Sequence, residues 1–351
     1  MTERLYLDHA ATTPMLPAAR TALVDGIAKW ANPSSPHAEG RAARAALEDA
    51  RSRIAAALGW SHEVIFTSGA TEAISIGLDG SSADATIVSA TEHDAVHRAG
   101  AKGYFLSVGV EGQVAADALS GRLGALGAKQ PMVAIQSANN ETGVLQPLHE
   151  LGPIIRGAGG LLFADCSQSA AKLPLPDADM IAVSAHKLGG PPGVGALLVR
   201  SLEMLRPTGG QERGYRGGTE NLPGVLGFAA AVEANRGWVE RAKDLRAHLD
   251  GAIEAAGGEI VARGSPRIAT IAGYRMPGIA SATQLIQFDM AGIAVSAGSA
   301  CSSGTIKASP VLAAMGWDEA AANEVVRVSF GPDTSRADVY RFIDAWKRIK
   351  R

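Results

Sequence analysis

The most constraining feature of this 351-residue sequence is a succession of short, continuously hydrophobic runs between residues 63 and 200. Each run has the length of a β-strand, and nearly all are hydrophobic throughout instead of alternating with polar residues. Strands of this kind are buried on both faces, as in parallel sheets that helices cover. The seven runs are 63–69, 85–90, 104–108, 132–138, 161–167, 180–186 and 195–200.

Most of these runs are separated by stretches long enough for a helix, which predicts an α/β fold with a mostly parallel seven-stranded sheet and helices on both faces. With 46% hydrophobic residues the chain can bury a large core. We expect a large domain over residues 13–240. A smaller α/β domain is expected to combine residues 1–12 with residues 241–351.

The charge and cysteine content narrow the classes of function. The formal net charge is −2, so the sequence indicates no nucleic-acid partner and no binding to anionic lipid. Its two cysteines are too few for a disulfide framework and fit a reducing compartment. The N-terminus has no signal-peptide pattern, and no apolar run has the length of a membrane span. These observations predict a cytoplasmic protein with small-molecule or protein partners and no metal site.

Polar residues follow several of the predicted strands, and ligands of open α/β sheets bind at this edge. The turn Ser68-Gly69-Ala70-Thr71-Glu72 leads into a helix, whose free N–H groups suit an anion such as a phosphate. A glycine turn with an ordinary cap explains that segment equally well. His93 follows the next strand, where a structural histidine is the more common case.

Two further strand ends are harder to explain without a ligand. Asp165 ends one strand, and an acid there is costly to bury unless it meets a cation. Lys187 ends the next strand, before a rigid glycine and proline loop. A lysine for covalent attachment, an acid for a pyridine nitrogen and a phosphate turn are together what pyridoxal phosphate requires.

The motifs as a set resemble the cysteine desulfurases, pyridoxal-phosphate enzymes of the class V aminotransferase family with the fold type I architecture. The resemblance runs along nearly the whole chain. The segments that carry it are YLDHAATTP, NPSSPH, FTSGATE, TEHDAV, NNETGVLQP, DCSQSAAKLP, SAHKLGGPPGVGAL, GGQERGYRGGTEN and SAGSACSSG.

The resemblance implies a role for each matching position. Lys187 would carry the cofactor covalently, and His93 would stack on its ring and exchange protons. The substrate carboxylate would be bound by Arg327 together with Asn140 and Asn32. Thr219 would reach the phosphate from the neighbouring subunit, which implies a homodimer. The remaining cofactor contacts would come from Ala70, Thr71, Asn140, Asp165, Gln168, Ser184 and His186.

The same resemblance implies a role for Cys301, which lies among very small residues in SAGSACSSG. As a thiolate it would take the sulfur of L-cysteine, leave L-alanine, and carry a persulfide to an acceptor protein or thiol in iron–sulfur cluster assembly or thiolation. Small neighbours would let this segment reach both the cofactor and the acceptor. Cys166, at a strand end, is interpreted as a packing residue.

Other activities fit the same motifs. A selenocysteine lyase, or another class V aminotransferase or lyase in which Cys301 is incidental, would keep the fold and the cofactor, because fold does not fix the reaction. A non-catalytic scaffold is disfavoured, since all the polar residues that the mechanism needs are present.

Overall fold

The computed structural model describes residues 4–234, 237–298 and 309–350. Its central feature is a seven-stranded sheet with the strand order β2-β8-β7-β6-β5-β3-β4. Six of the strands run in one direction, and only β8 runs the other way, antiparallel to its neighbours β7 and β2. The strands are β2 (Glu63–Thr67), β3 (Ala85–Ser89), β4 (Tyr104–Leu106), β5 (Pro131–Ala134), β6 (Leu161–Asp165), β7 (Met180–Ser184) and β8 (Gly195–Val199). The predicted sheet is therefore confirmed.

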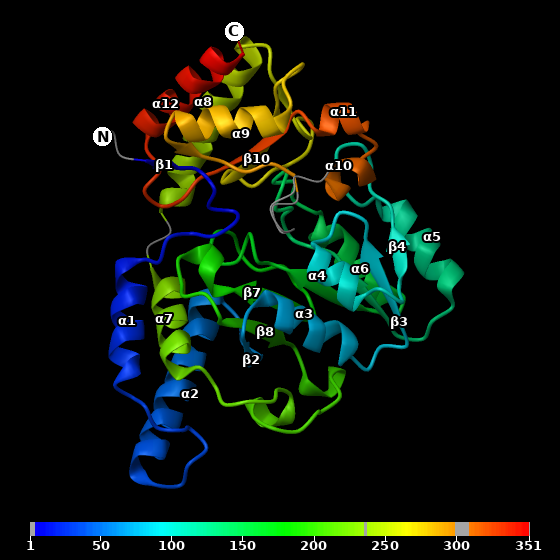
Figure 1. The fold of residues 1–351 in the computed structure, drawn as a ribbon. Coiled ribbons are helices and arrows are strands. Elements are labelled where there is room, and N and C mark those ends of the chain that lie inside the picture. Colours follow the sequence, from blue (N-terminus) through cyan, green and yellow to red (C-terminus); the bar gives the residue numbers. More distant parts are fainter. Residues whose placement is uncertain (1–3, 235–236, 299–308, 351) are drawn as a thin grey trace.

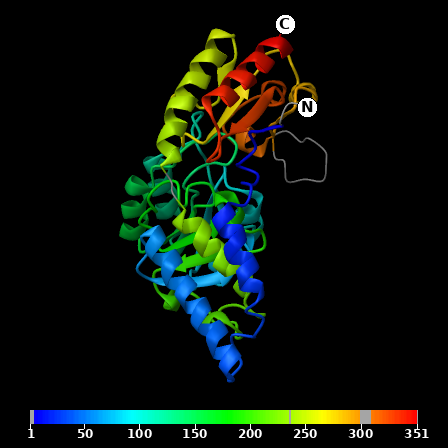
Figure 2. The ribbon, with the colours of Figure 1, turned by 90° about the vertical axis from the view of Figure 1, so that its left-hand side faces the viewer.

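Helices cover both faces of this sheet, which explains why its strands are hydrophobic throughout. One face packs against α2 (Ala38–Leu58), α5 (Ala116–Leu126), α6 (Leu148–Gly157) and α7 (Leu222–Glu233). The opposite face packs against α3 (Ala70–Asp79) and α4 (Asp94–Ala99). Adjacent strand residues alternate between the two cores: Ile65 joins the α3 side, while Val64 and Phe66 join the α2 side. Helices α1 (Pro17–Ile27) and α2 both pack on α7 along one flank (Figure 2).

A second core lies above one end of the sheet and joins the two ends of the chain (Figure 1). Its antiparallel sheet has the order β12-β10-β9, and β1 pairs with β11 beside it. The strands are β1 (Leu5–Tyr6), β9 (Glu259–Ile260), β10 (Ile271–Arg275), β11 (Ile293–Ala294) and β12 (Val325–Ser329). The helices of this core are α8 (Trp238–Ala255), α9 (Ser281–Met290) and α12 (Arg336–Ile349). Helices α10 (Pro310–Ala314) and α11 (Glu319–Ala322) join a smaller separate cluster with Val144 and Val261. Leu5 and Leu7 are buried in the second core, and the predicted domain boundaries stay predictions.

Within the described residues, no helix is both long and apolar enough to cross a membrane. The same residues contain no group of three or more His, Cys, Asp or Glu side chains that could hold a metal ion.

Candidate active site

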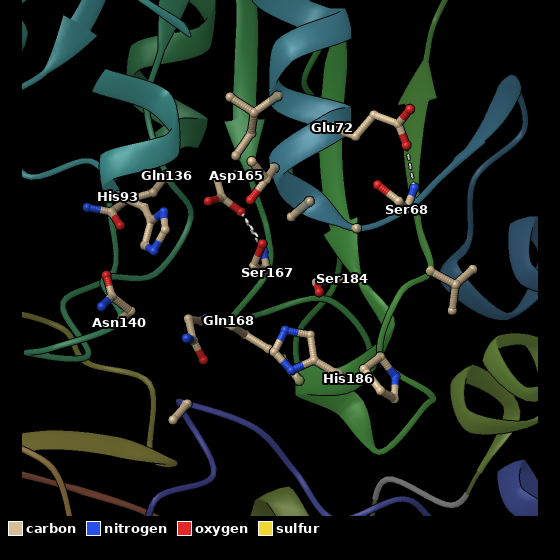
Figure 3. A pocket seen from close by; sticks show the side chains of 18 of the residues that line it. Ser68, Glu72, His93, Gln136, Asn140, Asp165, Ser167, Gln168, Ser184 and His186 are labelled. Atoms are coloured by element: carbon tan, nitrogen blue, oxygen red, sulfur yellow. Dashed lines mark hydrogen bonds between the residues drawn. The ribbon is translucent and has the colours of Figure 1, made fainter. Parts of the chain in front are cut away.

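A cavity of about 380 Å³ opens at the carboxyl ends of β6 and β7, beside the first turn of α3 (Figure 3). Its volume lies in the range of small-molecule sites. Nine residues assigned from the sequence to the cofactor line this single cavity, namely Ala70, Thr71, His93, Asn140, Asp165, Gln168, Ser184, His186 and Lys187. The loops after successive strands bring them together because the strands they follow end at one edge of the sheet.

The first turn of α3 forms an anion cradle. Gly69 is the N-cap with φ 150°, and it offers no side chain to cap the helix. The backbone N–H groups of Ala70 and Thr71 therefore face the cavity mouth without a capping oxygen. Gly195 of β8 allows the cradle to sit this deep, because a Cβ there would lie 2.8 Å from the Cα of Gly69.

Arg216 brings a positive charge to the outer side of this cradle. Its Nε lies 3.1 Å from a carboxylate oxygen of Glu72, in the first turn of α3. Glu72 also accepts a hydrogen bond from the backbone N–H of Ser68, which closes the turn (Figure 3). Hydrogen bonds and the Arg216 charge outweigh burial and lower the pKa of Glu72. The cradle is thus held on both sides by one ionised carboxylate.

Asp165 is the carboxylate on the cavity floor. It is 8% exposed at the end of β6, and its Oδ1 accepts hydrogen bonds from the backbone N–H of Ser167 at 2.8 Å and from the Ser167 hydroxyl. A second acid, Glu92, lies behind it, 3% exposed, and accepts from the backbone N–H of Gln136 at 2.7 Å. Burial, reinforced by the charge of Asp165, raises the pKa of Glu92 well above its usual value. Asp165 is therefore the acid available to a bound ligand.

His93 presents a neutral ring to the cavity. It is the N-cap of α4, and its Nδ1 accepts the backbone N–H of Ala95 at 3.1 Å. Burial lowers the pKa of His93, and the charge of Lys187 acts in the same direction against that of Asp165. Because Nδ1 is an acceptor, the hydrogen bond assigns the remaining proton to Nε2. The flat ring can thus stack on a ligand while Nε2–H donates.

The N-terminal segment fixes the turn that carries Lys187, which lies in the short helix η1 (Ala185–Leu188) after β7. The backbone N–H of Thr13 donates to the carbonyl of His186 at 2.9 Å, and the Thr13 hydroxyl donates to the carbonyl of Lys187 at 3.1 Å. The ring of His186 lies 3.1 Å from the Thr12 hydroxyl. The lysine backbone is therefore held by contacts outside its own strand.

Sequence reasoning missed a second lysine behind the first. Lys172 and Lys187 line one small cavity of about 80 Å³. Burial lowers the pKa of Lys172 to about 8, and the charge of Lys187 contributes. The motif DCSQSAAKLP contains Lys172, but nothing in its composition distinguishes this lysine from an exposed one. Only the folded chain places the two amines together.

The charge of Lys172 also reaches His9, which is 8% exposed and whose pKa burial lowers to about 4. An unfolded histidine titrates near 6.5, so the unfolded chain binds more protons between those values and stability falls with falling pH. We predict a loss of about 3 kcal/mol in the free energy of unfolding between pH 7 and pH 4 from this residue. Urea unfolding of wild type and His9→Asn at several pH values tests this, and equal pH dependence in both proteins would contradict it.

The predicted substrate residues are not all in the cavity. Arg327, on β12, does not line it but adjoins it through Asn140, whose carbonyl accepts from its guanidinium at 3.1 Å. Asn32 and Thr219 are exposed and lie outside the cavity lining. Cys301 lies outside the described residues. Cys166 is fully buried, and burial raises the pKa of its thiol to about 12.

The residues present fit pyridoxal phosphate. The cradle of α3 suits its phosphate, Asp165 suits its pyridine nitrogen, and Lys187 suits its aldehyde. Gln168 supplies an independent sign of a ligand, because its Nε2 donates to the carbonyl of Ala10 at 2.9 Å while its buried Oε1 has no partner in the described structure. A ligand hydroxyl or N–H group beside this amide would donate to Oε1 and complete its hydrogen bonding.

The fold and the cavity together define an α/β enzyme of fold type I with a pyridoxal-phosphate type of site. The chain belongs to the class V aminotransferase family, whose sequence profile matches residues 5–342. This family is pyridoxal-phosphate dependent in general.

Individual relatives show which members of this family the chain resembles. A protein of Gluconacetobacter diazotrophicus named cysteine desulfurase is 36% identical, over 98% of this chain and 93% of its own length. A crystal structure of a NifS-like protein from Rickettsia africae superposes with a TM-score of 0.90 at 30% identity, covering 99% of both chains. A second structure, of SspA in complex with cysteine, gives a TM-score of 0.80 at 27% identity, over 94% of this chain and all of that one.

Proposed function

We propose that this chain is a cysteine desulfurase that converts L-cysteine to L-alanine and retains the sulfur as a persulfide on Cys301. The observation that carries the proposal is the convergence of Lys187, Asp165 and His93 on one cavity beside an uncapped helix N-terminus. The identity to proteins named cysteine desulfurases and the cysteine bound by a structural relative support the substrate.

Pyridoxal phosphate, when bound, supplies the electron sink that lets a proton leave the α-carbon of an amino acid. The amine of Lys187 takes that proton at Nζ. His93 would cover the bound ring and donate through Nε2–H, because its Nδ1 accepts the backbone N–H of Ala95. The cavity walls place these groups around one common space.

The sulfur step balances with the chain's own thiol. The thiolate of Cys301 forms a bond to the substrate sulfur, the Cβ–S bond of the substrate breaks, and the carbon fragment takes a proton to become L-alanine. No external oxidant is required, because the sulfur is oxidised as the S–S bond forms and the electron pair of the broken Cβ–S bond reduces Cβ to a methyl group. An acceptor protein or thiol then removes the outer sulfur.

A homodimer would account for Asn32 and Thr219, two residues predicted for the site that lie outside the cavity lining. Thr219 and Asn32 are exposed on their own chain. Two residues after Asn32, the hydroxyl of Ser34 donates to the side-chain oxygen of Gln211, in the loop that leads to Thr219. A partner subunit would use Thr219 to complete the phosphate cradle. The exposed Trp30 beside Asn32, 78% accessible, is suited to such an interface. We place the enzyme in the cytoplasm.

The test is incubation of the purified holoenzyme with L-cysteine, followed by measurement of L-alanine and of protein-bound persulfide. We expect both products in equal amounts in the first turnover, and neither with Cys301→Ala, whose bound-cofactor absorbance should be unchanged. Alanine release by Cys301→Ala at the wild-type rate would overturn the persulfide route. Activity with selenocysteine alone would favour a selenocysteine lyase.

A further inference from the structure

Arg327 is already paired inside the protein, with Asp8. Its guanidinium is 6% exposed and lies 2.7 Å from Oδ1 of Asp8, while another of its N–H groups donates to the carbonyl of Asn140 at 3.1 Å. Its Nε is buried and has no partner among the described residues. Because Nε is buried, an incoming carboxylate would meet the second N–H groups of Nη1 and Nη2, since Asn140 and Asp8 each take one hydrogen bond from these nitrogens.

The carboxylate of Asp8 is fixed by its backbone. The preceding residue, Leu7, is hydrogen-bonded to the strands on either side of it. Its N–H donates to the carbonyl of Ala294 on β11 at 2.9 Å, and its carbonyl accepts the N–H of Ser329 on β12 at 2.8 Å. The hydroxyl of Tyr6 donates to the carbonyl of Asp8 at 3.1 Å. Asp8 thus sits on a segment that is paired along its length beside β12, the strand that carries Arg327.

The other acid near this guanidinium serves another contact. Glu141 is 8% exposed, and its Oε2 accepts the hydroxyl of Ser309. Burial raises the pKa of Glu141 although the charge of Arg327 opposes the shift. No hydrogen bond or ion pair joins Glu141 to Arg327 in the described structure. Asp8 is therefore the carboxylate that balances the buried cation before a substrate arrives.

We propose that Asp8 is a positioning residue that holds the guanidinium of Arg327 so that its outer N–H groups meet the α-carboxylate of an amino-acid substrate beside Asn140. This inference rests on the proposed function. The fixed guanidinium would make the site select amino acids, which carry a carboxylate, over simple amines, which do not. The alternative, in which Asp8 competes with the substrate for Arg327, predicts the opposite change in affinity.

The experiment compares Asp8→Ala with Asp8→Asn in the holoenzyme. L-Alanine carries the carboxylate, and ethylamine is the same molecule without it; the binding of both is followed through the absorbance of the bound cofactor. We expect Asp8→Ala to weaken L-alanine binding about tenfold or more with little change for ethylamine. Asp8→Asn keeps an oxygen acceptor for the guanidinium, so it should restore affinity to within about threefold of wild type.

Two results would overturn the inference. L-Alanine binding by Asp8→Ala that is unchanged or tighter would make Asp8 a bystander or a competitor. Equal losses for L-alanine and ethylamine would indicate general damage to the site. The KM for L-cysteine should rise with the loss of affinity while kcat changes less. Because binding of L-alanine needs no sulfur transfer, failure of the proposed function would appear separately, as a wild-type enzyme that releases no alanine from L-cysteine.

Discussion

Replacing Lys187 with alanine is expected to lower the rate of alanine release by at least about 10⁴-fold and to abolish covalent attachment of the cofactor. The size of the effect follows from two lost roles, since the same amine anchors the cofactor and takes the α-proton. The turn that carries Lys187 is fixed by Thr13, which holds the backbone of this lysine in place.

Borohydride reduction followed by peptide mass spectrometry measures the attachment directly. The wild-type peptide that contains Lys187 should carry the added mass of the cofactor, and the Lys187→Ala protein should carry it nowhere. Lys172→Ala is the matched control, because this lysine lines the same small cavity as Lys187. Its Lys187 peptide should still be labelled. A label on Lys172 in the wild type would overturn the assignment of the covalent lysine.

The sheet was predictable from the sequence because each of its strands is a short apolar run, and the polar residues after those runs reach one edge by topology. Asp165, Lys187 and His93 meet in the cavity for this reason. Most of the runs were detectable because their strands are buried on both faces; the edge strand β4, which exposes Tyr104 and Phe105, is the exception. A sheet with one exposed face would have shown alternation instead.

Contacts between distant segments were not predictable in the same way. Asp8 and Arg327 are separated by most of the chain, and only the packing of the N-terminal segment beside β12 brings them together. Lys172 and Glu92 became notable through burial, which neither residue type suggests on its own. The sequence therefore identified the groups that face the ligand more readily than the charged residues that surround them.

Replacing Asp165 with asparagine is expected to reduce kcat by about a thousandfold, the second of the two largest effects. An ionised carboxylate at the pyridine nitrogen keeps that nitrogen protonated, and an amide of the same shape cannot. The hydrogen bonds from Ser167 hold the side chain in place, so Asp165→Asn should bind the cofactor with only a modest loss of affinity. Cofactor affinity and kcat are measured on the same preparation.

Glu92 provides the matched control within the same cluster. Burial raises the pKa of Glu92 well above its usual value and so favours the uncharged acid, whose shape glutamine keeps; Glu92→Gln should therefore keep kcat within about threefold of wild type. The two variants differ only in which of two adjacent acids loses its carboxyl group. If Asp165→Asn kept kcat within tenfold of wild type, or if Glu92→Gln caused the larger loss, the acid at the pyridine nitrogen would have been assigned to the wrong residue.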